Sequence, residues 1–187
     1  MFHVEHFQIK HMDKQRLKDA VRNVPDFPIP GIQFKDVTTL FKDPDCLIEL
    51  LEGLYEMYKD KGITKIIGIE SRGFIMAPLL AARLKVGFVP IRKPGKLPAA
   101  CFEESYDKEY GTDTVQIHQD AVSPDDVVLL HDDLLATGGT MAAAVRLVEK
   151  FNPKKIYVNF IIELEELKGR GNFPTEIQVD SIIQYDI

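Results

Sequence analysis

Residues 127–150, VVLLHDDLLATGGTMAAAVRLVEK, constrain the fold of this 187-residue chain more than any other stretch. An apolar run of strand type stops at two adjacent carboxylates, Asp132 and Asp133, and Thr-Gly-Gly-Thr then leads directly into a helical pattern. Buried carboxylates are costly unless something uses them. Glycines before a helix let backbone amides approach an anion. The stretch therefore predicts a strand–loop–helix unit whose ligand carries both hydroxyls and phosphate.

The composition is that of an ordinary globular protein, with 45% hydrophobic and 28% charged residues, and the length suits one domain with a proper core. The net charge of -6 argues against a broad nucleic-acid-binding face. Cys46 and Cys101 fit no metal-ligand spacing and are predicted to be free thiols in a reducing compartment. No apolar run reaches the ~20 residues that span a bilayer. We therefore expect a cytoplasmic protein with no nucleic-acid or membrane partner.

The N-terminus lacks the apolar core of a signal peptide, although it holds His3, His6 and His11. A metal site there would need partners that the sequence does not show. We predict a flexible extension over residues 1–12 and a single domain over residues 13–187.

Strand and helix patterns alternate along the rest of the chain. Helices are predicted over 13–24, 46–61, 73–85 and 140–151, strands over 63–69, 86–91, 114–118, 127–130, 155–162 and 176–187, and a polar segment without burial period over 92–113. This order predicts an α/β fold with a mainly parallel central sheet flanked by helices. Ligands of such sheets bind at the carboxyl ends of the strands, so residues 70–74, 131–140 and 163–170 should converge on one rim.

The loop Ala136–Thr140 can wrap a single phosphate. Gly138 and Gly139 expose their amides, Thr137 and Thr140 offer hydroxyls, and the following helix adds the positive end of its dipole. No lysine follows the glycines, which disfavours a loop for nucleoside triphosphates. The two aspartates can accept hydrogen bonds from ribose hydroxyls or hold magnesium through water. The alternative is a helix-capping turn whose aspartates face solvent.

This stretch closely resembles the phosphoribosyl-diphosphate (PRPP) signature of the type I phosphoribosyltransferase family. Further matching blocks, which point to the adenine-specific branch, are PDFPIPGIQFKDVTTLFKDP, GIESRGFIMAPLLA, GFVPIRKPGKLP, SYDKEYG and IIELEELKGR. The resemblance implies the type I phosphoribosyltransferase fold with a flexible hood loop at about residues 92–113. It also implies a homodimeric, magnesium-dependent enzyme of purine salvage that converts adenine and PRPP to AMP and diphosphate. Magnesium is expected to be carried by PRPP, with no direct protein ligand.

Ser71 and Arg72 occupy a strand-to-helix turn, which is a natural seat for diphosphate. The family resemblance places diphosphate here, and it implies a strained non-proline peptide around Glu70–Ser71, with cis as a candidate geometry. An ordinary tight turn with a surface arginine is the alternative.

Arg92, Lys93 and Lys96 form a basic run that begins where a strand ends. Diphosphate needs such cations, although a solvated basic run is the usual interpretation. By resemblance, Arg92 or Lys93 reaches the active site of the partner subunit.

Within the hood, the resemblance singles out Glu109 as the acid/base that manages the purine proton, with Tyr110 beside it as a ligand-binding residue. Glu103 and Glu104 are rivals on the sequence alone. A hood that closes would exclude water from a reacting sugar. A charged surface hairpin is the alternative.

For the purine, Phe34 is predicted to stack on the base with Lys35 beside it, and Leu164 is predicted to cover the other ring face. The family commonly has arginine where Lys35 stands, and lysine cannot reproduce its planar fork. Core packing is the alternative for Phe34 and Leu164. Two rival functions are an enzyme for 6-oxopurines and a PRPP-sensing regulator that binds nucleic acid. His118 and His131 are expected to pack or hydrogen-bond and not to react.

Overall fold

The computed structural model describes residues 12–107 and 111–186 of the chain. The chain divides into two compact units, Met1–Met57 and Tyr58–Ile187. Each unit is described by itself below. In the ranges that the structure describes, no helix combines the length and the apolar character that a membrane span requires.

The first unit combines short helices with a two-stranded antiparallel sheet. Its elements are α1 (Lys14–Ala20), β1 (Arg22–Pro25), β2 (Gln33–Asp36), α2 (Thr38–Lys42) and α3 (Pro44–Tyr58), whose last residue begins the second unit. Asp13 caps α1 by accepting a hydrogen bond from the Arg16 amide at 3.0 Å. The helix predicted over residues 13–24 is too long, because α1 ends at Ala20. Its last residues leave the helix because Val24 pairs with Phe34 across the β1–β2 ladder.

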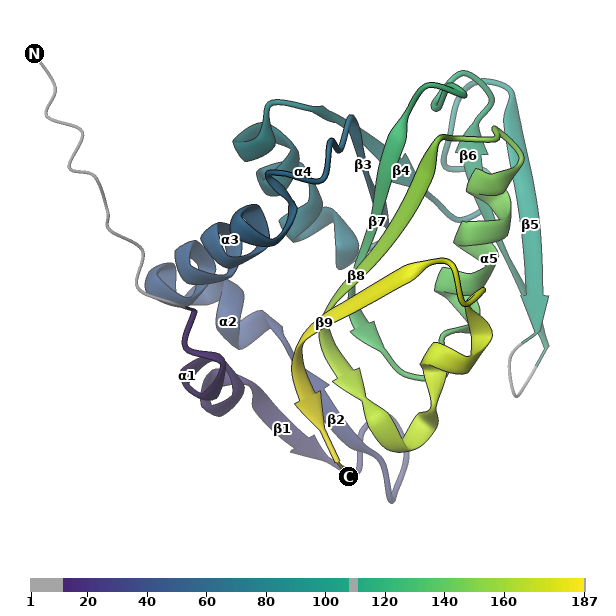
Figure 1. Cartoon of the computed structure of the whole chain (residues 1–187). Helices are drawn as coiled ribbons and strands as arrows, with labels where there is room; N and C mark the ends of the chain where they lie inside the picture. The colour runs from purple at the N-terminus through teal and green to yellow at the C-terminus, as the bar shows by residue number, and fades with distance from the viewer. Residues whose placement is uncertain (1–11, 108–110, 187) are drawn as a thin grey trace, which may run out of the picture. The chain divides into compact units, whose positions relative to one another are not determined.

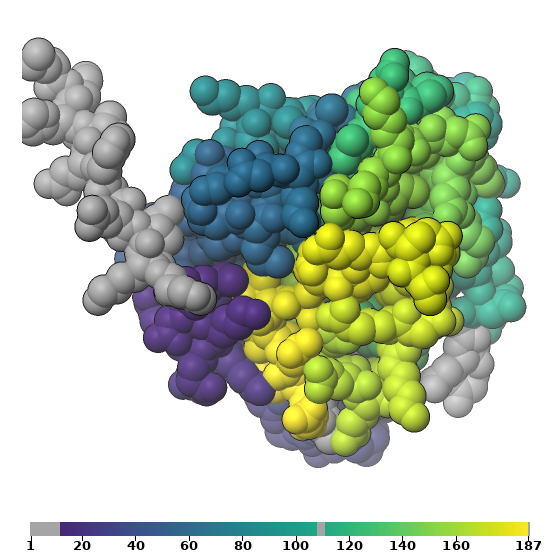
Figure 2. All heavy atoms as spheres, in the orientation of Figure 1, coloured from purple at the N-terminus to yellow at the C-terminus, as the bar shows by residue number. Residues whose placement is uncertain are grey.

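The second unit is built on a five-stranded sheet, which confirms the predicted mainly parallel architecture. The order is β4-β3-β7-β8-β9, and every neighbouring pair is parallel. The strands are β3 (Lys65–Ile69), β4 (Gly87–Ile91), β7 (Val127–Leu135), β8 (Lys155–Leu164) and β9 (Gln178–Tyr185). The edge strand β9, coloured yellow, forms part of the surface in Figure 2, while its Ile182 and Ile183 are buried.

Helices α4 (Gly73–Leu84) and α5 (Gly139–Glu149) cover the two faces of this sheet (Figure 1). Val128 and Leu130 of β7 belong to one buried cluster with the apolar side of α5. Side chains alternate along a strand, so Leu129 points to the other face, where α4 packs on β3 and β7. The strand ends that precede α4 and α5 therefore lie at the same edge of the sheet.

A third element of the second unit is an antiparallel hairpin of β5 (Cys101–Asp107) and β6 (Thr112–His118). It packs on α5 (Figure 1). The ring of Phe102 is in edge contact with that of Phe151, just after α5, at 5.3 Å between centroids. The prediction of an irregular segment over 92–113 is wrong for β5. This strand carries polar residues on both faces, and cross-strand partners such as Ser105 and Thr114, 2.9 Å apart, hold it in the hairpin.

Strand β7 is also longer than predicted. It continues past Leu130 to Leu135, because Asp132, Leu134 and Leu135 pair with the long neighbouring strand β8. Asp132 and Asp133 therefore lie in the last part of strand β7 and not in the loop that follows it.

Two short 3-10 turns, η1 (Glu165–Leu167) and η2 (Gly169–Asn172), follow β8 and lead toward β9. They form the segment of residues 165–172, which lies beside the start of α5 and completes the edge of the sheet where the candidate site lies.

Candidate active site

A cavity of about 290 Å³ opens at the carboxyl ends of β3 and β7, within the second unit. The turn after β3, the loop after β7 and the hairpin all contribute to its wall. Its lining consists of Glu70, Arg72, Lys93, Tyr106, Asp132, Asp133, Leu134, Ala136, Thr137, Gly138, Gly139, Thr140, Met141 and Phe160. The predicted convergence of residues 70–74 and 131–140 is thereby confirmed.

The two aspartates have different surroundings. Asp133 is buried, and its carboxylate forms an ion pair with the guanidinium of Arg72. Asp132 accepts a hydrogen bond from the Asp133 amide at 2.9 Å. Burial raises the pKa of Asp132 well above its usual range, and the nearby charge of Asp133 raises it further. Gly73 lets α4 approach this pair, because a β-carbon there would lie 2.7 Å from the His131 carbonyl oxygen.

The loop Ala136–Thr140 joins the aspartates to α5. Gly138 has a φ of 82°, a left-handed conformation that favours glycine, and α5 begins at Gly139. The amides at this end have no partner within the helix and sit at the positive end of its dipole. The loop therefore presents several donors to one side of the cavity, which suits a phosphate group.

The segment 165–172 packs tightly against the outer side of this loop. A β-carbon on Gly138 would come within 2.7 Å of the Gly169 carbonyl oxygen, and one on Gly169 would overlap the Ala136 carbonyl oxygen. The Asn172 side chain donates a hydrogen bond to the Thr137 carbonyl at 2.6 Å. The segment 165–172 thus contacts the backbone of the loop Ala136–Thr140 so closely that Gly138 and Gly169 have no room for a side chain. The predicted convergence of residues 163–170 on the same rim is also confirmed.

Arg170 attaches this segment to the sheet. Its guanidinium donates to both carboxylate oxygens of Glu163 at 2.6 Å, and it also bonds the Val179 carbonyl at 2.6 Å and the Ser181 hydroxyl at 2.9 Å. Burial raises the pKa of Glu163, but the hydrogen bonds from Arg170 and Ser181 outweigh it and leave the pKa below its usual range. The pair is therefore charged at neutral pH.

On the opposite wall, Glu70 organises the basic run. It accepts hydrogen bonds from Arg92 at 3.2 and 3.3 Å and from the Lys93 amide at 2.9 Å. Burial raises the pKa of Glu70, yet these bonds lower it by more, so that the net shift is downward. The Glu70–Ser71 peptide bond is cis, which is the geometry that the family resemblance suggested.

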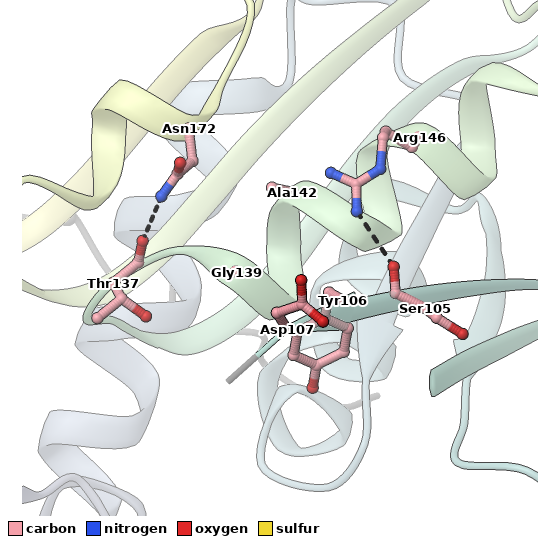
Figure 3. A pocket seen from close by; sticks show the side chains of 8 residues that line it. All are labelled: Ser105, Tyr106, Asp107, Thr137, Gly139, Ala142, Arg146 and Asn172. Atoms are coloured by element: carbon pink, nitrogen blue, oxygen red, sulfur yellow. Dashed lines mark hydrogen bonds between the residues drawn. The ribbon is translucent and has the colours of Figure 1, made fainter. Parts of the chain in front are cut away.

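A second cavity of about 390 Å³ is lined by residues of the hairpin, the loop Ala136–Thr140, α5 and η2 (Figure 3). Its lining is Ser105, Tyr106, Asp107, Thr137, Gly139, Ala142, Arg146 and Asn172. Arg146 is engaged there, since it bonds Glu104 at 2.8 Å and the Ser105 carbonyl at 3.5 Å. Tyr106, Thr137 and Gly139 line both cavities, which are therefore adjacent.

The residues predicted from the sequence fall into four groups. Those that line the first cavity are Arg72, Lys93, Asp132, Asp133, Ala136, Thr137, Gly138, Gly139 and Thr140. Those of the second unit that do not line it are Ser71, Arg92, Lys96 and Leu164. Phe34 and Lys35 belong to β2 of the first unit, where the Phe34 ring packs edge-on against Phe27 at 5.1 Å and Lys35 bonds Asn23 at 3.1 Å. Glu109 and Tyr110 lie outside the described residues.

Several residues that shape the cavity have no signal in the sequence pattern. Tyr106 sits in a stretch without burial period, yet it is only 8% exposed and contacts the loop. Gly169 lies in the charged segment 163–170, and Asn172 lies just after it. For this segment the sequence predicted only a position at the carboxyl edge of the sheet. The best available signal is that Gly169 follows an apolar strand by a few residues, as turn glycines often do.

Comparison with known proteins identifies the family. The sequence model of the phosphoribosyl transferase domain matches residues 37–171. The adenine phosphoribosyltransferase of Bacteroides thetaiotaomicron is 68% identical over 172 residues, which cover 92% of this chain and 98% of that protein. The chain belongs to the adenine phosphoribosyltransferase family.

Solved structures of family members agree with this assignment. The adenine phosphoribosyltransferase of Rhodothermus marinus matches with a TM-score of 0.86 and 49% identity, covering 92% of this chain and 98% of that one. The Saccharomyces cerevisiae enzyme, solved with an imino-altritol bisphosphate and adenine, matches with a TM-score of 0.85 and 41% identity, covering 91% and 98%. This family member therefore has the type I phosphoribosyltransferase fold and is a phosphoribosyl-transferring enzyme.

The carboxylates that line the cavity indicate how an enzyme of this family would hold magnesium. The described residues contain no group of three or more His, Cys, Asp or Glu side chains arranged as a metal site. The cavity offers three carboxylates, of which Asp133 is already paired with Arg72 and Glu70 with Arg92. This set fits a magnesium ion that keeps water ligands and is held chiefly by the phosphates of a substrate.

Proposed function

We propose that this enzyme transfers the 5-phosphoribosyl group of PRPP to adenine, giving AMP and diphosphate, and so serves purine salvage. The observation that carries the proposal is the shared cavity of the amide-rich loop Ala136–Thr140 and the Asp132–Asp133 pair, in a chain of this family. Phosphate and vicinal hydroxyls occur together on a ribose 5-phosphate, so one ligand satisfies both halves of the cavity.

The sugar end of PRPP is held by the strand–loop–helix unit. The 5-phosphate accepts hydrogen bonds from the amides of the loop and from the hydroxyls of Thr137 and Thr140. The carboxylates of Asp132 and Asp133 accept hydrogen bonds from the ribose hydroxyls. Burial raises the pKa of Asp132 and so disfavours its ionised form, which hydrogen bonds from the ribose hydroxyls would stabilise. This binding fixes the anomeric carbon relative to the rest of the site.

The diphosphate end lies toward the turn after β3. Ser71 and Arg72 receive the leaving diphosphate, with Arg92, Lys93 and Lys96 as further cations. When bound with the diphosphate, magnesium would supply the positive charge that neutralises this leaving group. Asp132, Asp133 and Glu70, which line the same cavity, would hold such an ion through water. Bond cleavage passes through an oxocarbenium-like state, as in glycosyl transfer generally, and fixed charges stabilise it.

Adenine is held between Phe34 and Leu164, with Lys35 beside it, and attacks the anomeric carbon on the side away from diphosphate. Glu109 handles the purine proton, and Tyr110 contacts the nucleotide. Adenine offers an amine where the 6-oxopurines offer a carbonyl, so its site must accept a hydrogen bond where theirs must donate one. This polarity is what restricts the enzyme to adenine.

The assembly that we propose is a cytoplasmic homodimer whose subunits each contain one phosphoribosyltransferase domain over residues 13–187. Its small-molecule partners are adenine and PRPP, with no nucleic acid or membrane. Arg92 or Lys93 reaches the partner's site in such a dimer. Lys93 also lines the cavity of its own chain, where its ammonium pairs with Asp113.

The test is to incubate the purified protein with PRPP, magnesium and, separately, adenine, hypoxanthine, guanine and xanthine, and to identify the monophosphates by chromatography. We expect AMP as the product. A 6-oxopurine nucleotide would overturn the base assignment and leave the PRPP site intact. No product from any base, with PRPP still bound, would support a regulator that senses PRPP.

Two variants assign the roles within the reaction. Glu109→Ala is expected to lower turnover with little change in the dissociation constant of PRPP, and unchanged turnover would remove Glu109 from the mechanism. Asp132→Asn combined with Asp133→Asn is expected to abolish measurable PRPP binding by calorimetry. Retained affinity in this double variant would refute the ribose assignment.

A further inference from the structure

A cluster of four polar side chains joins the hairpin to the phosphate loop. Thr140 Oγ1 donates a hydrogen bond to Tyr106 Oη at 2.9 Å, and Tyr106 Oη donates to Asp113 Oδ2 at 3.2 Å. Lys93 Nζ forms an ion pair with Asp113 and also donates to Tyr106 Oη at 3.4 Å. Tyr106 and Asp113 belong to β5 and β6, whereas Thr140 belongs to the loop and α5. The cluster therefore connects elements that are distant in the sequence.

The Tyr106 side chain is fixed in place by its ring. The residue is 8% exposed, and a β-carbon on Gly139 would be in ordinary contact with its Cδ2 at 3.5 Å. Lys93 Nζ lies 5.8 Å from the centre of the same ring. Burial lowers the pKa of Lys93, but the bonds to Asp113 and Tyr106 outweigh it and raise the pKa, so the ammonium is charged. The hydroxyl of Tyr106 is thus held between a cation, an anion and the loop.

Both hydroxyl hydrogens of this cluster have an acceptor within it. A hydroxyl has one hydrogen to donate and two lone pairs that accept. Tyr106 gives its hydrogen to Asp113 and accepts from Thr140 and Lys93. Thr140 gives its only hydrogen to Tyr106, so it cannot donate to a phosphate at the same time. Phosphate binding through Thr140 requires this bond to reverse.

We propose that Tyr106 is a positioning residue for the 5-phosphate, whose hydroxyl switches from acceptor to donor toward Thr140 when the phosphate binds. Thr140 then donates to the phosphate while it accepts from Tyr106, and its side chain keeps its orientation. The inference rests on the proposed function, because it assigns the loop to the 5-phosphate. It adds a residue outside the loop whose contribution to binding passes through Thr140.

Asp113 makes this reversal inexpensive. When the hydrogen of Tyr106 turns toward Thr140, the carboxylate of Asp113 still has the Lys93 ammonium as a partner, and its Oδ1 still accepts from the Thr114 amide at 2.9 Å. Lys93 also continues to donate to Tyr106. No buried acceptor is left without a donor, so the switch avoids the cost of an unsatisfied polar group. A hydroxyl is suited to this role because it can both donate and accept.

The alternative is that Tyr106 only holds the hairpin together. The two roles differ in what they predict for binding. A purely structural role would weaken folding and lower affinity whether or not Thr140 has a hydroxyl. A positioning role acts through that hydroxyl, so the effect of removing the Tyr106 hydroxyl must vanish when Thr140 has none.

The experiment is a double-mutant cycle on ribose 5-phosphate binding, measured by calorimetry at pH 7.5. Its variants are Tyr106→Phe, Thr140→Val and the two combined. We expect Tyr106→Phe to weaken binding about two- to tenfold, because Thr140 must then be oriented at the expense of binding, and to have no further effect on Thr140→Val. The effect should return in Thr140→Ser, which restores a hydroxyl. Tyr157→Phe, which removes the same atom from a tyrosine of β8 outside the cavity, is the matched control and should bind as the wild type does.

Steady-state kinetics supply the second readout. A contact made equally in the ground state and the transition state raises the KM for PRPP and leaves kcat unchanged, which is the pattern expected for Tyr106→Phe. Equal losses in the Thr140 and Thr140→Val backgrounds would overturn the inference, as would unchanged affinity in Tyr106→Phe. A wild-type protein that binds ribose 5-phosphate in this coupled way but forms no AMP would overturn the proposed reaction and leave the role of Tyr106 standing.

Discussion

The carboxylate of Glu163 accepts two hydrogen bonds from the guanidinium of Arg170, each 2.6 Å long. Glu163 is 4% exposed at the end of β8, whereas Arg170 lies in the segment 165–172, which packs against the loop Ala136–Thr140. The pair therefore fixes this segment to the sheet, and through the Gly169 and Asn172 contacts it supports the loop itself.

Arg170→Met is expected to destabilise the protein by about 3 kcal/mol, because it leaves the buried carboxylate of Glu163 without its charged partner. Urea unfolding at pH 7.5 measures this loss. Lys154→Met is the matched control, since Lys154 pairs with Asp125 at 3.1 Å on the surface and its loss should cost less than ~1 kcal/mol. Equal effects of the two substitutions would show that the Glu163–Arg170 pair contributes no more than a surface ion pair.

Gly169→Ala is expected to lower stability by about 1–3 kcal/mol and to raise the KM for PRPP, because the new methyl group would overlap the Ala136 carbonyl and come within 2.7 Å of Leu135 Cδ1. Gly171 is the control in the same segment. A β-carbon there meets nothing within 4 Å, so Gly171→Ala should change stability by less than ~0.5 kcal/mol. The comparison uses urea midpoints and initial rates for both variants, and an unaltered KM in Gly169→Ala would contradict the support role of this segment.

The Glu163–Arg170 and Gly169–Ala136 contacts could not be predicted from the sequence, whereas the loop that they support could. The loop Ala136–Thr140 and the Asp132–Asp133 pair could be predicted because an apolar strand, two glycines and a helical pattern are consecutive, and the local pattern determines the local chemistry. The parallel sheet followed from the alternation of strands and helices. The approach of Gly169 to Ala136 depends on how far the segment after β8 folds back, and no local pattern encodes that distance.

The hairpin illustrates a second reason. Residues 101–107 carry charged and polar side chains on both faces, so neither a period of two nor a period of 3.6 appears. Their strand forms because β6 pairs with it and α5 covers it, with Glu104 bonded to both Arg146 and Lys150 at 2.8 and 2.9 Å. Such pairing energy arises only in the folded unit. The burial of Tyr106, which lies in the same stretch, cannot be predicted from the sequence for the same reason.

Asp132→Asn is expected to stabilise the ligand-free protein while it weakens PRPP binding. Burial and the charge of Asp133 raise the pKa of Asp132, so its ionised form is disfavoured by folding and the neutral amide removes that cost. We expect a higher urea midpoint at pH 7.5 together with a loss of PRPP affinity of roughly ten- to a hundredfold, as for a hydrogen bond to a charged group. Asp133→Asn should instead lower the midpoint, because it breaks the ion pair with Arg72. A lower midpoint for Asp132→Asn would contradict this interpretation of its pKa.

His131 predicts how stability depends on pH. The residue is fully buried, its Nδ1 lies 2.9 Å from Asn159 Oδ1, and its Nε2 has no hydrogen-bond partner among the described residues. Asn159 donates from its amide nitrogen to the Asp180 carbonyl at 3.4 Å, so its oxygen accepts and His131 must carry its proton on Nδ1. Burial lowers the pKa of His131 from 6.5 to about 4, although the bond to Asn159 and the charge of Asp133 act in the other direction.

Because the pKa in the folded state is below that of the unfolded chain, the unfolded state binds a proton that the folded state refuses as the pH falls below about 6.5. The contribution of His131 is therefore intact above that pH and is lost progressively down to about pH 4, with a loss of roughly 2 kcal/mol between pH 7 and pH 5. His131→Gln keeps an amide donor for Asn159 and has no proton to bind in this range. Urea unfolding of both proteins at the two pH values isolates the histidine, since every other titrating group is shared. Parallel losses of stability in wild type and His131→Gln would show that His131 is not neutral in the folded protein.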